Sequence, residues 1–297
     1  MSEKLVSVII NSHNGAKFIN KSVNSVLNQT YKNLEIIFWD NASVDNSKEI
    51  LQQINDARIK INYSEKFEKL YSAKNKAVKL SKGEFLAFLD VDDWWEKDKL
   101  EIQILEMEKR NCGLSCSNYW IINEKKNSKF PAFKKNIIRK NHFDSALKKY
   151  FVGMSTLIIK RDIYNSLDYG FDHSYEIIGD YDLVLRLLKN HKIVFLNNKL
   201  SFYRWHINNL SNKKFKLNIL ELTLWRKKML QNKFFFNENS KKYLYDHILF
   251  LMSLYFKKKN NNKKIIFFLT KINSFKVFCK ILFLLIIPKE LINKIRS

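Results

Sequence analysis

Three carboxylates directly follow an apolar run in the first third of the chain. The run Phe85–Leu89 has the length and composition of a buried strand, and Asp90, Asp92 and Asp93 stand at its end. Open α/β sheets bind ligands beyond the carboxyl ends of their strands. Mg²⁺ and Mn²⁺ prefer carboxylate oxygens, which they share with substrate phosphates. The pattern predicts a metal–diphosphate site; the alternative is a solvated acidic turn that caps the next helix.

Other polar residues stand where two further strands are expected to end. The apolar run Val6–Ile10 leads into Ser12, and Leu34–Trp39 leads into Asp40. Because parallel strands end at one edge of a sheet, these residues are expected beside the first cluster. The chain has only six glycines and neither a Gly-x-Gly-x-x-Gly nor a Walker A pattern. A metal ion is therefore the simpler way to neutralise a diphosphate.

The hydrophobic pattern alternates between strand and helix up to about residue 205. This alternation predicts an α/β fold with a mostly parallel, doubly wound, Rossmann-like sheet. The segment Asn123–Asn141 is polar, basic and poorly periodic, and we interpret it as a loop or mobile flap. The expected strands are 6–10, 34–39, 59–63, 84–90, 114–120, 154–160, 193–196 and 200–205. Two expected helices span 70–80 and 99–109, and the others begin near 18, after a cap at Asp45 or Asn46, near 162 and at 179.

The last part of the chain is strongly basic and only helical in pattern. Residues 210–297 carry 20 Lys and Arg against 4 Asp and Glu, within a net charge of +24 for the whole chain. We therefore expect a domain at 1–211 and a helical, basic extension at 212–297. Its lysines alternate with apolar residues, which is typical of a helix in an anionic bilayer interface. Ordinary packing with a solvated lysine face is the alternative, and no nucleic-acid motif is present.

The cysteines and the hydropathy pattern indicate a cytoplasmic protein. Cys112, Cys116 and Cys279 are an odd number, and no secretory signal precedes the first expected strand. A second ligand pair for zinc is missing. No stretch of 18 apolar residues is long enough for a transmembrane helix.

Five segments of the chain resemble the family 2 glycosyltransferases of the GT-A fold and occur in the same order as in that family. The resemblance covers roughly 5–211, about two thirds of the chain. It implies an enzyme that takes a sugar from a nucleotide diphosphate and inverts its anomeric centre. The segments are Val6–Asn14, Asn28–Tyr31, Glu35–Asp45, Ala73–Asp93 and Gly179–Leu187.

The resemblance assigns donor-binding roles to four residues. Ser12 matches a nucleotide-binding position after the first strand, and Asp40 matches the acidic residue that accepts a hydrogen bond from uracil. Lys74 stands where the family commonly has Arg, so a compact ammonium group replaces a planar guanidinium group with several donors. Asp90, the first residue of the Asp-x-Asp motif, would hold the ribose or a metal-bound water.

The same resemblance places Mn²⁺ or Mg²⁺ at Asp92, with His206 completing the ligand shell and Asp93 as a substitute ligand or a helix cap. Such a metal stabilises the charge that builds on the departing nucleoside diphosphate. Arg204, in the segment Tyr203–His206, would contact the diphosphate. A structural histidine is the alternative for His206.

An inverting transfer also needs a base for the proton of the acceptor hydroxyl. The stretch Gly179–Leu183 resembles the family's Glu-Asp-Tyr-Asp-Leu, which maps the base to Asp180 and leaves Asp182 to orient neighbours. Gly179 replaces a carboxylate that is often present there. Asp180 as a plain helix cap is the alternative. Trp95 or Trp94 could stack on a sugar, or could pack in the core.

The resemblance, together with these residues, implies a metal-dependent inverting hexosyltransferase that uses a UDP-sugar. The acceptor would be a lipid-linked or surface glycan, such as a lipooligosaccharide or capsule, at the inner face of the cytoplasmic membrane. Two alternatives stay open: a nucleotidyltransferase, which also uses Asp-x-Asp and a metal, and a non-catalytic membrane scaffold with a degenerate transferase domain. Gly179 and Lys74 differ from the family pattern, which is why the non-catalytic scaffold stays an alternative.

Overall fold

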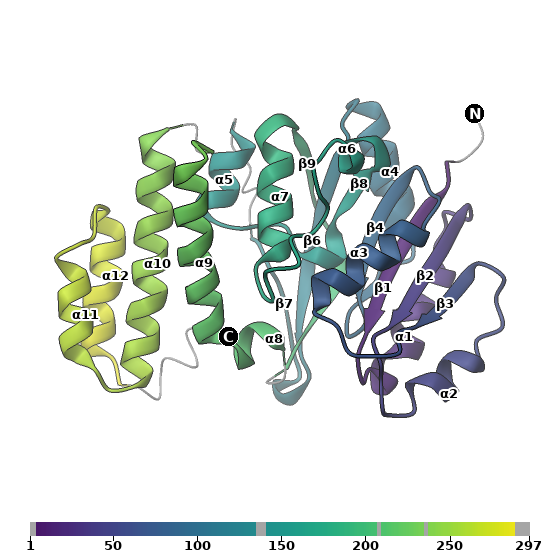
Figure 1. Cartoon of the computed structure of the whole chain (residues 1–297), viewed down its shortest axis with the longest axis horizontal. Helices are drawn as coiled ribbons and strands as arrows, with labels where there is room; N and C mark the ends of the chain where they lie inside the picture. The colour runs from purple at the N-terminus through teal and green to yellow at the C-terminus, as the bar shows by residue number, and fades with distance from the viewer. Residues whose placement is uncertain (1–3, 135–140, 207–208, 235–236, 289–297) are drawn as a thin grey trace. The chain divides into compact units, whose positions relative to one another are not determined.

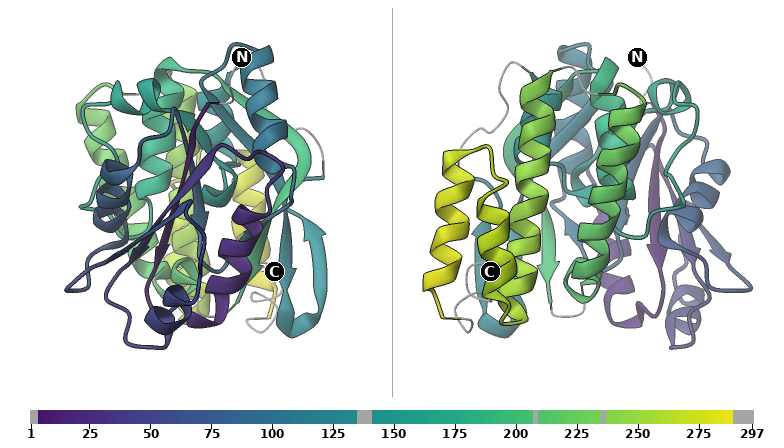
Figure 2. Two further views of the ribbon diagram at one scale, coloured as in Figure 1. Left: turned by 90° about the vertical axis from the view of Figure 1, so that its right-hand side faces the viewer. Right: turned by 60° about the vertical axis from the view of Figure 1, so that its left-hand side comes forward.

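The first half of the sheet is parallel, as the alternation of strands and helices predicts. The computed structural model describes residues 4–134, 141–206, 209–234 and 237–288. The strand order begins β3-β2-β1-β4, with bounds β1 (Val6–Ser12), β2 (Leu34–Asp40), β3 (Ile59–Tyr63) and β4 (Phe85–Asp90). The connecting helices are α1 (Ala16–Leu27), α2 (Ser47–Gln52) and α3 (Leu70–Leu80). Figures 1 and 2 show α1 and α3 on opposite faces of the sheet.

The second half of the sheet is mixed. Strand β8 runs antiparallel to both β4 and β6, whereas β6 and β9 run parallel to each other. The short strands β5 and β7 pair antiparallel with β9 and β6. In the described residues these strands complete one nine-stranded sheet, with bounds β5 (Trp94–Trp95), β6 (Leu114–Asn123), β7 (Ser128–Pro131), β8 (Ile158–Lys160) and β9 (Ile193–Trp205).

Four more helices and two short 3₁₀ turns accompany this half. The 3₁₀ turns are Glu124–Lys126 and Met154–Thr156. The helices are α4 (Lys99–Lys109), α5 (His142–Lys148), α6 (Arg161–Asn165) and α7 (Gly179–Asn190). Helix α7 carries the predicted base at its first turn, and β9 carries Arg204 near its end.

The central strands are buried along their length because helices cover both faces of the sheet. All seven residues of β1 and five of the six in β4 are buried. Their side chains join those of β2, α1 and α4 in one core, which includes Val8, Ile36, Ala87 and Leu100. Burying a large aliphatic side chain contributes about 1.5–3 kcal/mol. This core fixes the strand ends from which the site residues project.

Besides the unexpected strand β5 and helix α5, three segments differ from the expectation. Within Asn123–Asn141, Ser128–Pro131 forms a hairpin strand with β6, and residues 135–140 lie outside the described part of the chain. The expected strand 154–160 begins as a 3₁₀ turn, and only Ile158–Lys160 pairs. The two expected strands after 193 are one strand, β9, whose register with β6 shifts on both sides of Asn118. This bulge accommodates the polar residues that looked like a turn.

The contacts divide the chain into two units, which are Met1–Ala146 with Tyr150–Ile207 and Leu147–Lys149 with Asn208–Ser297. The second unit contains helices only, among the residues described: α8 (Leu210–Lys213), α9 (Phe215–Gln231), α10 (Glu238–Lys258), α11 (Asn262–Leu269) and α12 (Phe275–Ile286). Helices α9, α11 and α12 each contact α10.

The buried Asp246 of α10 fixes the turn before α12. One of its oxygens accepts from the Asn273 backbone N–H at 3.0 Å, and the other accepts from that of Ser274 at 2.8 Å.

None of the helices in the described part of the chain combines the length and apolar composition that crossing a membrane requires.

Candidate active site

The carboxyl ends of β1, β2 and β4 bring three predicted nucleotide-binding residues to one edge of the sheet. In the parallel register Ser12 is the partner of Asp40, and Asn11 is the partner of Asp90. Adjacent strands lie about 4.8 Å apart, so these residues share one region of the rim. The structure thus gathers Ser12, Asp40 and Asp90 from distant parts of the sequence.

Asn11 and Ser12 are buried polar residues with unused hydrogen-bonding atoms. Their exposed fractions are 8% and 3%, and their side-chain polar atoms have no hydrogen-bond partner among the described residues. A Cβ at Gly15 would lie 2.2 Å from Ser12 Oγ, which shows how tightly the following turn closes on this hydroxyl. A buried polar group left unsatisfied costs about 1–3 kcal/mol. A ligand that bonds these atoms would remove that cost, and Asn11 is a candidate that the sequence did not predict.

The turn after β2 holds the Asp40 carboxylate in place. Its Oδ1 accepts a hydrogen bond from Ser43 Oγ at 2.5 Å, and its Oδ2 accepts one from the Ser43 backbone N–H at 3.2 Å. A carboxylate has about four lone-pair sites, so further acceptor capacity remains. Asp40 can therefore still accept a hydrogen bond from a nucleotide base.

Helix α3 supplies Lys74, which forms an ion pair with Asp90. The distance from Lys74 Nζ to Asp90 Oδ1 is 2.8 Å, and the side chains are 4% and 39% exposed. The buried ammonium group therefore orients a carboxylate that remains open to solvent and to a ligand. In this structure Lys74 acts on the site through Asp90.

Asp92 and His206, the two predicted metal ligands, meet at the same rim. The distance between His206 Nε2 and Asp92 Oδ2 is 3.0 Å, and Arg204 Nε donates to the Asp92 carbonyl at 2.9 Å. The His206 ring also stacks on Phe18, with the ring centroids 5.9 Å apart. The guanidinium group of Arg204 pairs in addition with Glu124. These contacts hold the residues at the end of β9 against the Asp-x-Asp turn.

Asp93 is buried and bound to two other segments. Its carboxylate accepts from Ser155 Oγ at 2.6 Å and from the Arg204 backbone N–H at 2.9 Å. Burial raises the pKa of Asp93 well above its usual range, and the neighbouring charges of Asp92 and Asp90 add to the rise. Asp93 does not cap the next helix, which begins at Lys99. It connects the turn to β9 and to the 3₁₀ turn at Ser155.

The two tryptophans after the turn lie in different surroundings. Trp95 is 3% exposed, belongs to the central core and donates from Nε1 to the Ser155 carbonyl at 2.7 Å. That position leaves its ring no open face for a sugar. Trp94 is half-buried and stacks on Phe202, with the ring centroids 4.9 Å apart.

Asp180 lies in the first turn of α7. Its Oδ1 accepts from the Tyr181 backbone N–H at 2.8 Å and lies 3.2 Å from the hydroxyl of Tyr71. Burial raises the pKa of Asp180, which the Tyr181 bond and the charge of Lys74 partly oppose. The charges of Lys74 and Asp90 both act on this carboxyl, so the candidate base lies close to the Lys74–Asp90 ion pair.

Asp182 forms an ion pair inside the protein. It is fully buried, and its Oδ2 lies 2.8 Å from Nη2 and 2.9 Å from Nε of Arg186 one turn along α7. Arg186 also donates to the carbonyls of Tyr169 and Gly170, at 2.8 and 2.6 Å. Asp182 thus anchors the loop that precedes α7.

We expect Asp182→Asn to lower the free energy of unfolding by about 3 kcal/mol, because it leaves a buried guanidinium without its counter-charge. Urea denaturation measures this change. The matched control is Glu106→Gln, which removes the acid of an i,i+4 pair with Arg110, whose side chain is 60% exposed. That control should cost less than about 0.5 kcal/mol. Equal losses in the two variants would contradict a structural role specific to Asp182.

The donor set for a metal ion is small. Among the residues that the structure describes, no group of three or more His, Cys, Asp or Glu side chains is arranged to hold a metal. Asp92 and His206 nevertheless supply two donor atoms at one point. At phosphate sites Mg²⁺ typically takes one or two protein ligands, and the substrate phosphates and water supply the others. The pair therefore fits a divalent ion that is bound jointly with a diphosphate.

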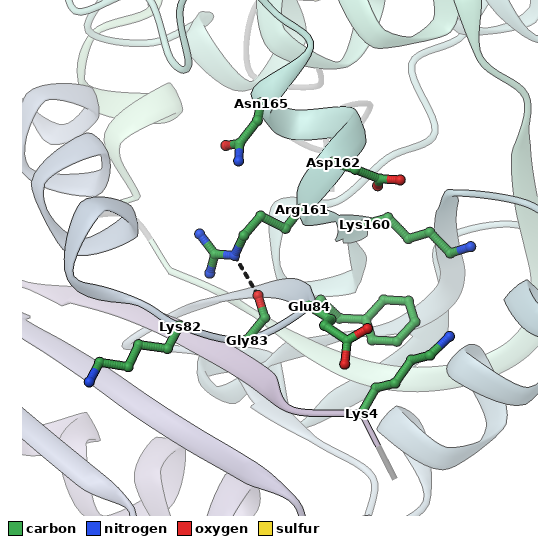
Figure 3. Close-up of a pocket in the computed structure, with 9 residues that line it drawn as sticks. Lys4, Lys82, Gly83, Glu84, Lys160, Arg161, Asp162 and Asn165 are labelled. Atoms are coloured by element: carbon green, nitrogen blue, oxygen red, sulfur yellow. Dashed lines mark hydrogen bonds between the residues drawn. The ribbon is translucent and has the colours of Figure 1, made fainter. Parts of the chain in front are cut away.

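A pocket of about 490 Å³ lies at the opposite edge of the sheet, at the amino ends of β1 and β4. Figure 3 shows that Arg161 points into it and donates from Nε to the Gly83 carbonyl. None of the predicted site residues lines this pocket. It is lined by Lys4, Lys82, Gly83, Glu84, Phe85, Lys160, Arg161, Asp162 and Asn165.

Comparison with solved structures identifies the fold. S. aureus TarS superposes with a TM-score of 0.61 at 16% identity, over 83% of this chain and 43% of that chain. TarS 1-349 in complex with UDP superposes with a TM-score of 0.55 at 17% identity, over 73% of this chain and 65% of that chain. These likenesses confirm the predicted GT-A architecture, a mixed and mostly parallel α/β sheet followed by helices.

Comparison with curated sequences identifies the family. The family profile "Glycosyl transferase family 2" matches residues 7–167. Two Escherichia coli proteins, WfgD and WfaP, are both named UDP-Glc:alpha-D-GlcNAc-diphosphoundecaprenol beta-1,3-glucosyltransferase. WfgD is 37% identical over 73% of this chain and 83% of its own length, and WfaP is 34% identical over 72% and 82%. With more than half of the sequence matched by the profile, the chain belongs to glycosyl transferase family 2 and is a glycosyltransferase.

Proposed function

We propose that this enzyme transfers glucose from UDP-glucose to a hydroxyl of GlcNAc carried on a diphospho-lipid, with inversion at the anomeric carbon. The donor and the acceptor are those named for the two E. coli relatives. One observation carries the proposal: the Asp92–His206 pair and the Lys74–Asp90 pair lie at the carboxyl ends of the strands, next to unsatisfied polar atoms. With a divalent ion on Asp92 and His206, this arrangement would supply positive charge for the diphosphate and hydrogen-bonding groups for the nucleoside.

The donor would lie across the ends of β1, β2 and β4. Asp40 would accept a hydrogen bond from uracil, Ser12 and Asn11 would bond the nucleoside, and Asp90 would hold the ribose. Asp40 and Ser12 are each 3% exposed, so the protein already shields them from water. Arg204, which is held against the Asp92 carbonyl, would contact the diphosphate.

Asp92 and His206 would hold Mn²⁺ or Mg²⁺. Such an ion would supply positive charge next to the departing diphosphate. Arg204 adds a fixed positive charge on the same side of the site. Because Asp93 is buried and already bonded to Ser155 and Arg204, it would orient this turn.

Asp180 would be the general base. The acceptor oxygen forms the new bond to the anomeric carbon while its proton moves to Asp180, and the electrons of the broken bond leave with UDP. A general base works best when its pKa is near the working pH. The raised pKa of Asp180, caused first by burial, is a shift in that direction.

The test is an assay of the full chain with a panel of UDP-sugars and a synthetic GlcNAc-diphospho-lipid, with Mn²⁺ or with a chelator. We expect glucose transfer and UDP release only with UDP-glucose and metal. Full activity with the chelator would remove the metal from the proposal, and preference for another sugar would correct the donor. Release of pyrophosphate from a nucleoside triphosphate would favour a nucleotidyltransferase. Nucleotide binding without turnover would favour a scaffold.

We propose further that the second unit lies on an anionic membrane, at the inner face of the cytoplasmic membrane. Phe275 and Ile286 on α12 are 81% and 76% exposed, and α12 buries only Ile281 and Leu284. An apolar face flanked by lysines is typical of helices that lie in the bilayer interface. The other exposed apolar residues of α11 and α12 are Ile266, Phe267, Leu282 and Phe283, and their lysines are Lys263, Lys264, Lys276 and Lys280.

We expect a Phe275→Ser, Phe283→Ser and Ile286→Ser triple variant to bind phosphatidylglycerol vesicles at least about 100-fold more weakly, because it removes three large apolar side chains from the interface. Vesicle co-sedimentation measures the loss. The matched control makes the same change to Ser at Val44, Phe67 and Leu105 of the first unit, which are 89%, 61% and 58% exposed. Undiminished binding of the α12 variant, or equal loss in the control, would show that α12 is not the anchor.

A further inference from the structure

The hydroxyl group of Tyr71 reaches the start of α7 from helix α3. Tyr71 is 3% exposed, and its hydroxyl oxygen lies 2.9 Å from the Ile177 carbonyl and 3.2 Å from Asp180 Oδ1. The hydroxyl carries one hydrogen, so it donates to one of these two oxygens or divides its bond between them. Tyr71 is therefore in direct contact with the candidate base.

The backbone of α7 leaves room for this ring because residue 179 is glycine. A Cβ at Gly179 would lie 2.5 Å from Cδ2, 2.6 Å from Cε2 and 2.7 Å from Cγ of Tyr71. The Tyr71 ring cannot move freely away, because Phe171 stacks on it with the ring centroids 5.5 Å apart. The absence of a side chain at 179 and the contact between Tyr71 and Asp180 are thus parts of one arrangement.

The two oxygens of Asp180 differ in their surroundings. Oδ1 accepts from the Tyr181 backbone N–H at 2.8 Å and faces Tyr71. Oδ2 accepts no hydrogen bond from any residue in the described part of the chain. The charged or titratable groups that act on this carboxyl or lie against it are Tyr71 and Lys74 of α3, Asp90 of β4, Tyr181 of α7 and Tyr150.

We propose that Tyr71 is the positioning residue of the catalytic base: it holds Oδ1 of Asp180 so that Oδ2 faces the acceptor hydroxyl. This inference rests on the proposed role of Asp180 as the base. Gly179 takes part because only a residue without Cβ lets the Tyr71 ring lie against the first turn of α7.

The contact suits both protonation states of the base. While Asp180 is ionised, Tyr71 donates to Oδ1. When the acceptor proton has moved to Oδ2, the Tyr71 hydroxyl can return its hydrogen bond to the Ile177 carbonyl. Burial and the charge of Asp180 raise the pKa of Tyr71 well above its usual range, so Tyr71 keeps its own proton throughout. It orients the base and carries no proton in the reaction.

The test compares Tyr71→Phe with the wild type in the pH dependence of kcat/KM. Hydrogen bonds to an ionised carboxylate lower its pKa, so their loss should raise the pKa of Asp180. Since transfer requires the ionised base, activity falls as the pH drops through this pKa. We expect the acid limb of the profile to move upward by about one pH unit. At pH values below the limb kcat should be lower than in the wild type, and the dissociation constant of UDP should be unchanged.

Tyr31→Phe is the matched control. Tyr31 is 7% exposed, and its hydroxyl donates to the Lys4 carbonyl at 2.5 Å, so the same buried group is removed away from Asp180. The control should keep the wild-type profile even if it loses stability. An unmoved limb in Tyr71→Phe, or an equal movement in Tyr31→Phe, would overturn the proposal.

A second variant keeps the hydroxyl and displaces it. Gly179→Ala pushes the Tyr71 ring away, and we expect its acid limb to move in the same direction; this variant decides the question if Tyr71→Phe does not fold. Asp180→Asn separates the two hypotheses. Retained transfer in Asp180→Asn would reject Asp180 as the base, whereas lost transfer together with an unmoved limb in the folded Tyr71 or Gly179 variant would reject only the role of Tyr71.

Discussion

Asp180→Asn is expected to lower the rate of sugar transfer by about 10³-fold, because an amide cannot take the proton of the acceptor hydroxyl. Donor binding should not change, since none of the contacts proposed for UDP comes from α7. Single-turnover kinetics with UDP-glucose and the lipid acceptor measure the rate, and calorimetry with UDP measures binding. In the wild type, activity should be lost as the pH falls through the pKa of Asp180. Because burial raises this pKa, the loss should occur at a higher pH than for an exposed aspartate.

The control for this change lies at the other edge of the sheet. Asp162→Asn makes the same substitution in α6, beside the pocket in Figure 3, where no predicted site residue lies. It should keep the wild-type rate and pH profile. If Asp180→Asn transferred glucose at the wild-type rate, another group would have to be the base.

Asp92→Asn should remove metal-dependent donor binding and lower transfer by about 10³-fold, since several kcal/mol of charge stabilisation would be lost. In the structure Asp92 Oδ2 lies 3.0 Å from His206 Nε2, so this substitution also replaces the carboxylate partner of the imidazole with a neutral amide. Calorimetry with UDP and Mn²⁺ gives the affinity, and UDP release gives the rate.

The comparison variant for Asp92 is Asp98→Asn. Asp98 stands just before α4, and its side chain makes no capping hydrogen bond there. The variant changes the net charge of the same loop region equally and should bind UDP and Mn²⁺ normally. Metal-dependent binding that survived in Asp92→Asn would place the ion at a different group.

Several elements follow directly from local patterns in the sequence. The helices Leu70–Leu80 and Lys99–Lys109 and the strand Ile59–Tyr63 have the predicted bounds. Apolar residues recur in these helices at a spacing that places them on one face, and the apolar runs of β1 and β4 indicate strands that are buried on both sides. Such signals depend on neighbouring residues alone, so the sequence contains them in full.

The hairpin at Ser128–Pro131 and the continuous β9 could not be predicted in this way. Strand β7 pairs only with β6, so it needs no apolar face and looks like a loop. In β9 the polar residues Asn197 and Asn198 are exposed at the bulge opposite β6, where they mimic a turn. In both segments the strand is stabilised by pairing with β6, across a hairpin for β7 and across about 80 residues of chain for β9.

Asp93 and Trp95 show the same limit within the site. As sequence, Asp93 resembles Asp92, and Trp95 resembles Trp94. Ser155 distinguishes them: its hydroxyl binds Asp93, and its carbonyl accepts from the Trp95 indole. Ser155 lies about 60 residues away and carries no motif, so neither contact leaves a signal near the Asp-x-Asp turn.

The sequence by itself determined the alternation of strands and helices, the edge of the sheet at which the polar residues gather and the family, because the ends of parallel strands share an edge whatever packs around them. Only the tertiary structure decided which carboxylates remain open to substrates. Asp93 is bonded to Ser155 and to the backbone of Arg204, whereas Asp90 stays exposed beside Lys74 and Asp180 meets the buried Tyr71. Burial and hydrogen-bond partners come from segments that only folding brings together, and they set the charge and direction of each group.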